Sequence, residues 1–321
     1  MKFNRKGKII LSLVMMVLLL VTGCSNNDSD AAADEDKVVR IGYQKNGPLF
    51  ILKSLGSLEE RLEKLGYKVE WKEFQDGPSL LEALNTGSID FGRTGNTPPV
   101  FSQASGSDLK YVAAGKSKFE GSGILVQKDS TIESVNDLKG KKVAFSKGSS
   151  SHYLIVKALE QAGLSLDDIE PAYLTPGNAR IAFEQGQVDA WVVWDPYTSS
   201  TEVNSDARLL VNGEGLTTDR DFFVATEKFA SNHKEVMDAI IEEVTVSMDW
   251  ANNHHPELIK LLADALKMDE ESVTKAVERR EYGVEAITEE IIEEQQELAD
   301  LFYKLEIIPK KISISKAVME Q

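Results

Sequence analysis

The chain contains one pattern twice, in the same order and roughly a hundred residues apart. The first copy opens at residues 41–47 (IGYQKNG) and closes at 81–91 (LEALNTGSIDF), and the second opens at 143–149 (VAFSKGS) and closes at 181–191 (IAFEQGQVDAW). The two openings are 102 positions apart and the two closings about 100, so the copies keep register. Two copies of one unit predict two similar lobes with a cleft between them.

Strand and helix signals alternate within each copy, which is the signature of an α/β fold with mostly parallel sheets and covering helices. The predicted strands of the first copy are residues 38–43, 68–74, 89–92 and 109–114. Those of the second are 142–145, 170–174 and 190–194. Apolar-periodic segments between them predict helices, among them 48–65, 97–104 and 151–162.

The chain is expected to cross between the lobes twice, at residues 123–127 and again at 221–226. We therefore assign residues 38–126 and 223–321 to lobe 1, and residues 127–222 to lobe 2. Long amphipathic helices follow residue 226, and we expect them to pack against lobe 1. Two extended connections between doubly wound lobes form a natural hinge.

Residues 1–23 have the layout of a secretory signal peptide. Residues 2–8 hold four basic side chains and no acid, and residues 9–21 form an apolar run too short for a comfortable membrane span. The run ends at Cys24, the single cysteine, in a sequence that resembles the lipobox of bacterial lipoproteins. Residues 24–37 then predict a flexible tether. We expect an extracytoplasmic domain held at the bacterial cell membrane by a lipid on Cys24.

The composition suits a large globular monomer and excludes nucleic acid as a partner. Apolar residues make up 42% of the chain, which is ample for the cores of two lobes. The formal net charge is −16, and residues 1–23 contribute only basic residues to it, so the rest of the chain is more acidic still. Phosphate backbones require basic patches. A small anion held by backbone N–H groups remains compatible with this charge.

The motifs of catalysis and metal binding are missing from the sequence. Its four histidines have no spacing typical of a zinc site, and no Gly-x-Ser-x-Gly elbow occurs. The segment 115–117 (GKS) has the end of a phosphate loop but no glycine-rich arc before it. We expect a binding protein that uses neither a metal nor a cofactor, rather than an enzyme.

Four helix starts follow predicted strands, two in each copy: Gly47–Pro48, residues 96–98, residues 149–151 and Asp195–Pro196. Ligands of open α/β sheets bind outside the carboxyl ends of the strands, where helix starts offer unpaired N–H groups. Each start also has an ordinary explanation as a helix cap. Their equivalent positions in a duplicated layout favour a small oxyanion held between the lobes.

Several segments resemble the aliphatic sulfonate-binding proteins of ABC importers, within the sulfonate, nitrate and taurine substrate-binding lipoproteins. They are residues 41–45 (IGYQK), 77–84 (GPSLLEAL), 91–99 (FGRTGNTPP), 150–154 (SSHYL) and 188–197 (VDAWVVWDPY). The resemblance covers nearly all of residues 38–310. It implies a type II periplasmic-binding-protein fold, in which two lobes close on an organosulfonate and deliver it to the transmembrane subunits of an ABC permease for sulfur metabolism.

The resemblance also implies a set of ligand-binding residues. They are Gln44, Thr94, Gly95, Asn96, Ser149, Ser150, His152, Trp194 and Asp195. Hydroxyl and backbone N–H groups of this set would hold the sulfonate oxygens, and Trp194 would pack on the organic tail. Where family members often carry Asp after the Thr-Gly pair, this chain has Asn96.

Two of these residues have competing structural roles. Asp195 precedes a proline and would cap a helix. If it faced the ligand instead, its charge would disfavour dianions and favour a zwitterion such as taurine. His152 lies one residue inside a predicted helix, where a structural role is the stronger interpretation.

Three alternatives stay open at the level of the sequence. Taurine, nitrate, phosphonate and thiamine-precursor pyrimidine carriers share this architecture, so the ligand class can differ while the transport role stands. Related two-lobed folds host enzymes. A surface lipoprotein that binds a protein partner would instead expose a large apolar patch and hold no ligand in its cleft.

Overall fold

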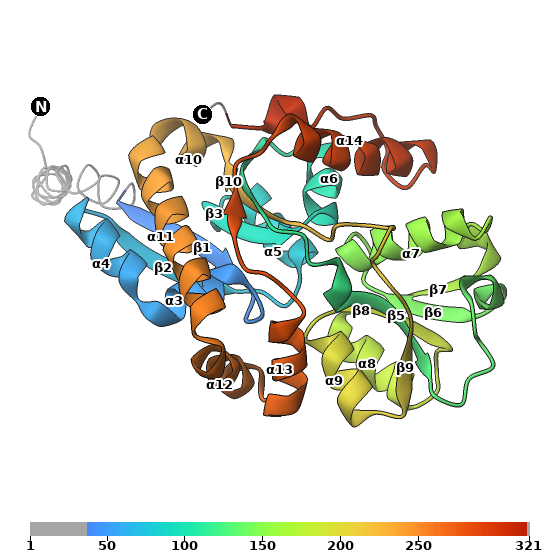
Figure 1. Cartoon of the computed structure of the whole chain (residues 1–321). Coiled ribbons are helices and arrows are strands. Elements are labelled where there is room, and N and C mark those ends of the chain that lie inside the picture. Colours follow the sequence, from blue (N-terminus) through green and yellow to red (C-terminus); the bar gives the residue numbers. More distant parts are fainter. Residues whose placement is uncertain (1–36, 320–321) are drawn as a thin grey trace, which may run out of the picture.

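The computed structural model describes residues 37–319, which form two lobes side by side, each built on its own sheet (Figure 1). The predicted signal peptide, Cys24 and nearly all of the predicted tether lie outside the described residues. The alternation of strands and helices predicted from the sequence is present in both lobes.

Sheet 1 has six strands in the order β11-β4-β10-β3-β1-β2. Their bounds are β1 (Val38–Tyr43), β2 (Lys68–Glu73), β3 (Phe91–Gly95), β4 (Leu109–Gly115), β10 (Asp221–Thr226) and β11 (Val284–Glu285). Strand β1 pairs in parallel with β2 and β3, whereas β10 runs antiparallel between β3 and β4. The carboxyl ends of β1, β2 and β3 therefore meet at one edge of the sheet.

Sheet 2 repeats this plan with five strands in the order β7-β6-β8-β5-β9. Their bounds are β5 (Ser122–Gln127), β6 (Lys142–Phe145), β7 (Glu170–Tyr173), β8 (Ala190–Trp194) and β9 (Ala207–Asn212). Here β6 pairs in parallel with β7 and β8, and β5 runs antiparallel between β8 and β9. The correspondence of β1, β2 and β3 with β6, β7 and β8 confirms the duplication read from the sequence.

Helices cover both faces of sheet 1. They are α3 (Pro48–Leu55), α4 (Ser57–Lys64), α5 (Gly77–Asn85), α6 (Thr97–Ala104), α10 (Glu227–Asn232), α11 (Lys234–Asn253), α12 (His255–Leu266), α13 (Glu270–Glu278) and α14 (Glu289–Lys304). The prediction of a single helix over residues 48–65 is wrong. Gly56 adopts a left-handed conformation with φ of 74°, so the segment divides into α3 and α4.

Sheet 2 is covered by α7 (Ser150–Gln161), α8 (Pro176–Glu184) and α9 (Tyr197–Asn204). Short 3₁₀ turns complete the lobes at Phe119–Gly121, Val135–Leu138, Leu166–Asp168 and Ser315–Ala317. The helices after residue 226 bury their apolar faces in the cores of lobe 1, as expected. Helix α13 also packs against α9 of lobe 2, so the C-terminal region contacts both lobes.

The lobe boundaries differ from the expected ones by a few residues. All of β5 pairs within sheet 2, and all of β10 pairs within sheet 1. Each strand therefore belongs wholly to the lobe that the chain has just entered. The crossings themselves are therefore residues 116–121 and 213–220, rather than the strands that follow them. Both connections lie beside the cleft.

Candidate functional site

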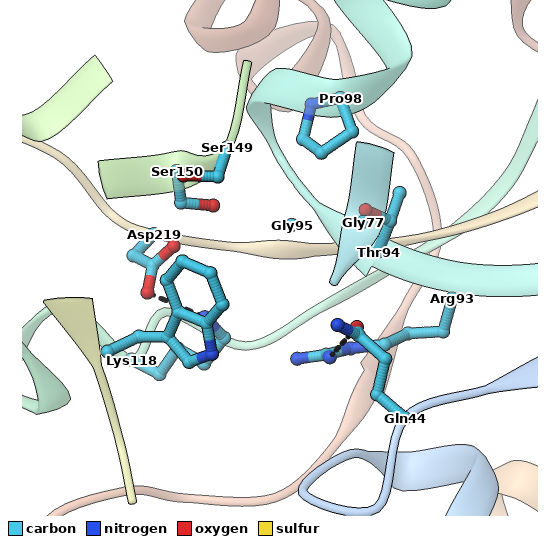
Figure 2. Close-up of a pocket in the computed structure, with 11 residues that line it drawn as sticks. Gln44, Gly77, Arg93, Thr94, Gly95, Pro98, Lys118, Ser149, Ser150 and Asp219 are labelled. Carbon is cyan, nitrogen blue, oxygen red and sulfur yellow. Dashed lines mark hydrogen bonds and ion pairs between the residues drawn. The ribbon is translucent and has the colours of Figure 1, made fainter. Parts of the chain in front are cut away.

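A small cavity lies between the two lobes, and we call it the anion cavity (Figure 2). Its lining comes from both sheets and from both crossings. The lining residues are Gln44, Gly77, Arg93, Thr94, Gly95, Pro98, Lys118, Ser149, Ser150, Trp194 and Asp219. Six of the nine residues implied by the resemblance are among them.

Helix starts from both lobes reach this cavity. Pro98 belongs to the first turn of α6 in lobe 1, and Ser149 and Ser150 form the start of α7 in lobe 2. Neither helix has a side-chain cap, since the Ser149 hydroxyl donates instead to Ser146 O at 2.7 Å. The start of α7 therefore keeps N–H groups that no capping side chain satisfies. Pro98 and Pro99 have no N–H, so α6 contributes mainly its positive dipole end, which favours an anion as that of α7 does.

The other helix starts have different surroundings from those expected. Gly77, at the start of α5, lines the anion cavity although it was not among the predicted starts. The predicted start at Gly47 instead lies against the Arg93 guanidinium, since a Cβ on Gly47 would be 3.0 Å from Nη1. The anion cavity is therefore lined by the helix start at Gly77 and not by the predicted start at Gly47.

Thr94 provides an unpaired hydroxyl at the end of β3. The residue is fully buried, and its Oγ1 makes no hydrogen bond within residues 37–319. The hydroxyl lies against the backbone of Gly77, where a Cβ would overlap it. Buried hydroxyls normally have partners. This one is therefore available to donate to a bound oxyanion.

A buried cluster of charges, absent from the sequence expectations, adjoins the cavity. Asp221 lies at its centre and pairs with Arg93, with Lys118 at 3.5 Å and with Arg280 at 3.6 Å. Burial alone would raise the pKa of Asp221, but the three cations outweigh burial and lower it. Asp219 accepts from Lys118 Nζ at 2.6 Å.

The sequence held partial signals for this cluster. Arg93 directly precedes Thr94 inside a segment that was used for the resemblance, and Lys118 follows the carboxyl end of β4. Gln44, which the resemblance did imply, accepts from Arg93 Nη1 at 3.1 Å. Asp219, Asp221 and Arg280 carry no local motif and meet these cations only through folding.

A second small cavity adjoins the first, and we call it the tail cavity. Its lining shares Arg93, Lys118, Trp194 and Asp219 with the anion cavity. The remaining lining residues are Asn46, Gly121, Ser122, Asp195 and Arg280. Polar and charged groups dominate this set, and Trp194 is its one aromatic side chain.

Asp195 accepts a hydrogen bond from the start of α9 and also lines the tail cavity. Its Oδ1 accepts from the backbone N–H of Ser199 at 2.9 Å and thereby caps the first turn of α9. Its Oδ2 faces Arg279 Nε at 3.1 Å, and the residue lines the tail cavity. Burial raises the pKa of this carboxyl, while Arg279 and the hydrogen bonds from Ser199 act in the opposite direction.

Asn96 lines neither cavity. Its side chain donates to Thr217 Oγ1 at 3.3 Å and accepts from Thr97 Oγ1 at 3.1 Å. It faces the crossing at residues 213–220 rather than the cleft, so the departure from Asp at this position lies outside both cavity linings.

His152 lies outside both cavities too. It is buried among Phe101, Phe145 and Phe302, and its Nδ1 accepts from the Gly148 N–H at 3.2 Å. Desolvation, and then the nearby Lys147, lower its pKa to about 4. The ring is therefore neutral near pH 7 and packs between the lobes, as the structural interpretation of this residue predicted.

The two lobes are in contact around the cavities. Asn46 Nδ2 donates to Asp195 O at 3.2 Å across the cleft, and a methyl group on Gly95 would overlap Ser150 Oγ. At the outer edge, Arg279 pairs with Glu202 at 2.7 Å, and Asn204 donates to Asp269 at 2.6 Å. The structure thus represents a closed arrangement of the lobes.

Within residues 37–319, no three or more His, Cys, Asp or Glu side chains gather in a way that would hold a metal ion. None of the helices in this part of the chain combines the length and apolarity needed to cross a membrane.

Comparison with known sequences identifies a family and named relatives. A family model described as NMT1/THI5 like matches residues 62–258. A putative aliphatic sulfonates-binding protein of Escherichia coli (strain K12) is 40% identical over 292 residues, covering 90% of this chain and 91% of that protein. One of Bacillus subtilis (strain 168) is 36% identical over 316 residues, covering 98% and 94%.

The chain is also similar to a protein of known structure. The alkanesulfonate-binding protein SsuA from Xanthomonas axonopodis pv. citri, bound to MOPS, matches with a TM-score of 0.85 and 40% identity. The match covers 88% of this chain and 98% of that chain. It confirms the two-lobed binding-protein fold expected from the sequence. These relatives are named as binding proteins and not as enzymes.

Proposed function

The chain belongs to the NMT1/THI5-like family, and from this premise we propose that it is an extracytoplasmic solute-binding protein for aliphatic sulfonates. It captures them in the cleft between the lobes and delivers them to an ABC permease for use as a sulfur source. The observation that carries this proposal is the anion cavity, where two uncapped helix starts from opposite lobes meet the unpaired hydroxyl of Thr94.

The sulfonate group is held by donors from both lobes. Thr94 Oγ1 and the backbone of Gly95 serve it from lobe 1, and the start of α7 at Ser149 and Ser150 serves it from lobe 2. Gln44 orients Arg93 at the same cavity. Because donors from both lobes bind one anion, the ligand stabilises the closed arrangement relative to an open one.

The organic tail extends past Trp194 toward the tail cavity. Trp194 lines both cavities, so its indole offers an apolar surface at the junction between them. Sulfate has no tail to place there. Buried apolar contact with the tail therefore contributes affinity for organosulfonates that sulfate cannot gain.

Closure takes place about the two crossings, residues 116–121 and 213–220. In this proposal residues 38–115 move with residues 221–319 as lobe 1, and residues 122–212 move as lobe 2. Each crossing places a buried charged residue, Lys118 or Asp219, at the cavities. The contacts of a ligand with either crossing therefore depend on how far the lobes have closed.

The membrane location follows from the N-terminal sequence. A signal peptide of residues 1–23 is removed, Cys24 is acylated, and residues 24–37 tether a monomeric binding domain to the cell membrane. Replacing Cys24 by Ala removes the anchor and leaves the cleft intact. We expect the Cys24→Ala protein to leave the membrane fraction with an unchanged sulfonate dissociation constant, and retention in membranes would contradict the lipoprotein assignment.

Calorimetric titration of the mature chain tests the function. The panel contains straight-chain alkanesulfonates, taurine, an arylsulfonate, sulfate, nitrate and an aminopyrimidine. Saturable heat with alkanesulfonates and none with sulfate or nitrate is the expected result. Binding of nitrate or the pyrimidine alone would keep the transport role and overturn the substrate. Silence across the panel would instead support a surface lipoprotein that binds a protein partner.

A further inference from the structure

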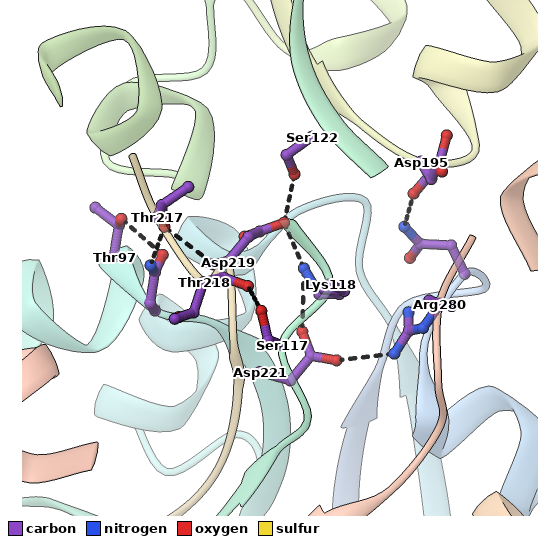
Figure 3. Close-up of polar contacts among 12 residues, drawn as sticks. Thr97, Ser117, Lys118, Ser122, Asp195, Thr217, Thr218, Asp219, Asp221 and Arg280 are labelled. Carbon is purple, nitrogen blue, oxygen red and sulfur yellow. Dashed lines mark hydrogen bonds and ion pairs between the residues drawn. The ribbon is translucent and has the colours of Figure 1, made fainter. Parts of the chain in front are cut away.

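Asp219 places an unsatisfied hydrogen-bond acceptor inside the cleft (Figure 3). The residue is 1% exposed and lines both the anion cavity and the tail cavity. Its Oδ2 accepts from Lys118 Nζ at 2.6 Å and also from the Ser122 hydroxyl. Its Oδ1, in contrast, makes no hydrogen bond within the described part of the chain.

The backbone fixes the direction of this carboxylate. Asp219 has a φ of 44°, in the left-handed region that Asp and Asn tolerate better than most residues. Its N–H donates to Thr217 Oγ1 at 2.9 Å, and Lys118 and Ser122 hold Oδ2. With the main chain and one oxygen held, Oδ1 cannot turn toward another protein donor without losing these bonds.

The free oxygen lies near the anion end of the cleft. A Cβ placed on Gly95 would be 3.9 Å from Asp219 Oδ1 and would overlap Ser150 Oγ. Gly95 and Ser150 are two of the residues proposed to hold the sulfonate. A ligand group that reaches Oδ1 is therefore close to the sulfonate in the covalent structure.

Charge decides which donor suits this position. Lys118 Nζ already pairs with Asp219 at 2.6 Å and also lies 3.5 Å from Asp221. A cationic group on the ligand would add positive charge beside Arg93, Lys118 and Arg280, which line the same cavity. A hydroxyl satisfies Oδ1 without adding a charge there.

We propose that the cleft selects sulfonates that carry a hydroxyl group near the sulfonate group. This hydroxyl donates a hydrogen bond to Asp219 Oδ1. This inference rests on the proposed function. A simple alkanesulfonate binds by the same anion contacts but leaves a buried carboxylate oxygen unsatisfied. A site built to accept a hydrogen bond discriminates against the analogue that lacks the donor.

The test compares three ligands of equal carbon length by calorimetry on the mature chain: ethanesulfonate, 2-hydroxyethanesulfonate and 2-aminoethanesulfonate. We expect 2-hydroxyethanesulfonate to bind at least about tenfold tighter than ethanesulfonate, the amount expected for a hydrogen bond to a charged acceptor. We also expect it to bind tighter than the amino compound.

A variant assigns the preference to one side chain. Asp219→Gly tolerates the left-handed backbone and removes the acceptor without placing a donor in the cavity, whereas an Asn NH₂ group could still donate to the hydroxyl oxygen. The tenfold preference for the hydroxyl should then disappear, while ethanesulfonate still binds. Asp238→Asn, on the exposed surface of α11, removes the same charge far from the cleft and should retain the preference.

The outcomes separate this inference from the proposed function. Equal affinity for ethanesulfonate and 2-hydroxyethanesulfonate would overturn the inference and leave sulfonate binding intact. Tighter binding of the amino compound would overturn the neutral-donor argument, as would an unchanged preference in Asp219→Gly. Failure of all three sulfonates to bind would overturn the proposed function and this inference together.

Discussion

The hydroxyl of Thr94 is buried beside two helix starts and makes no hydrogen bond to any described residue. If it donates to the sulfonate, its removal deletes a charge-assisted bond without creating a cavity, because Val has nearly the same shape as Thr. We expect Thr94→Val to weaken sulfonate binding by about 1–3 kcal/mol.

Calorimetry measures this change, and the free energy of unfolding serves as the control. The lost hydroxyl has no protein partner, so Thr94→Val should leave the stability of the ligand-free protein unchanged or slightly raised. An unaltered dissociation constant would remove Thr94 from the site.

His152 makes a second prediction at the residue scale, on stability rather than binding. Its folded pKa is lowered to about 4 by burial, whereas an unfolded histidine titrates near 6.5. Between these values the unfolded chain binds the extra proton, so stability is complete above pH 6.5 and is lost as the pH falls toward 4. The loss attributable to His152 is on the order of 2–4 kcal/mol.

Chemical denaturation at several pH values measures this contribution. Carboxylates elsewhere in the chain also titrate in the acid range, so the comparison is with His152→Gln, which cannot gain a proton. The wild-type and variant curves should converge as the pH falls. Parallel curves between pH 6.5 and 4 would show that His152 is not held neutral by the fold.

At the scale of elements, the end of β3 and the start of α7 approach each other across the cleft. Gly95 permits this approach, since a methyl group there would overlap Ser150 Oγ. We expect Gly95→Ala to keep both lobes folded but to displace the Ser150 hydroxyl from the anion cavity. Sulfonate affinity should fall at least tenfold, with little change in melting temperature of the ligand-free protein.

The matched control for this variant is Gly177→Ala. Gly177 is in the first turn of α8 in lobe 2, and a Cβ there would meet no atom within 4 Å. Ala should be tolerated or slightly stabilising at this helical position. If Gly95→Ala bound sulfonate as tightly as Gly177→Ala, close contact of β3 with α7 would not be part of the binding geometry.

On the scale of the whole molecule, α13 and the residue after it connect lobe 1 to lobe 2. Arg279 contacts both Asp195 and Glu202, and all three side chains are largely buried. Removing one partner of a buried pair leaves the other charge uncompensated. Arg279→Gln should therefore favour the open arrangement, by about 1–3 kcal/mol.

Small-angle X-ray scattering measures this opening as a larger radius of gyration without ligand, and sulfonate should reverse it. Lys275→Gln provides the control, because Lys275 pairs with the same Glu202 from a more exposed position. Such a pair contributes about 0–1 kcal/mol. Equal scattering curves for the two variants would exclude Arg279 as a contact that holds the lobes together.

The repeated pattern determined most of the fold without any tertiary information. Strand bounds such as Leu109–Gly115 and Ala190–Trp194 follow from local apolar runs between turn residues, and helix starts at Ser150 and Thr97 follow from local capping and proline signals. Because the two copies keep register, two similar lobes were also expected. The anion end of the cleft was predictable for the same reason.

The tertiary structure alone decided the charge cluster and the tail cavity. Arg93, Lys118, the neighbouring pair Asp219 and Asp221, and Arg280 come from distant parts of the sequence and meet only where both crossings and the C-terminal region converge. Local periodicity carries no information on such contacts, since they depend on how two lobes close. For the same reason the sequence could place Asn96 and His152 near the site, whereas only tertiary contacts show that Asn96 faces Thr217 and that His152 lies among Phe101, Phe145 and Phe302.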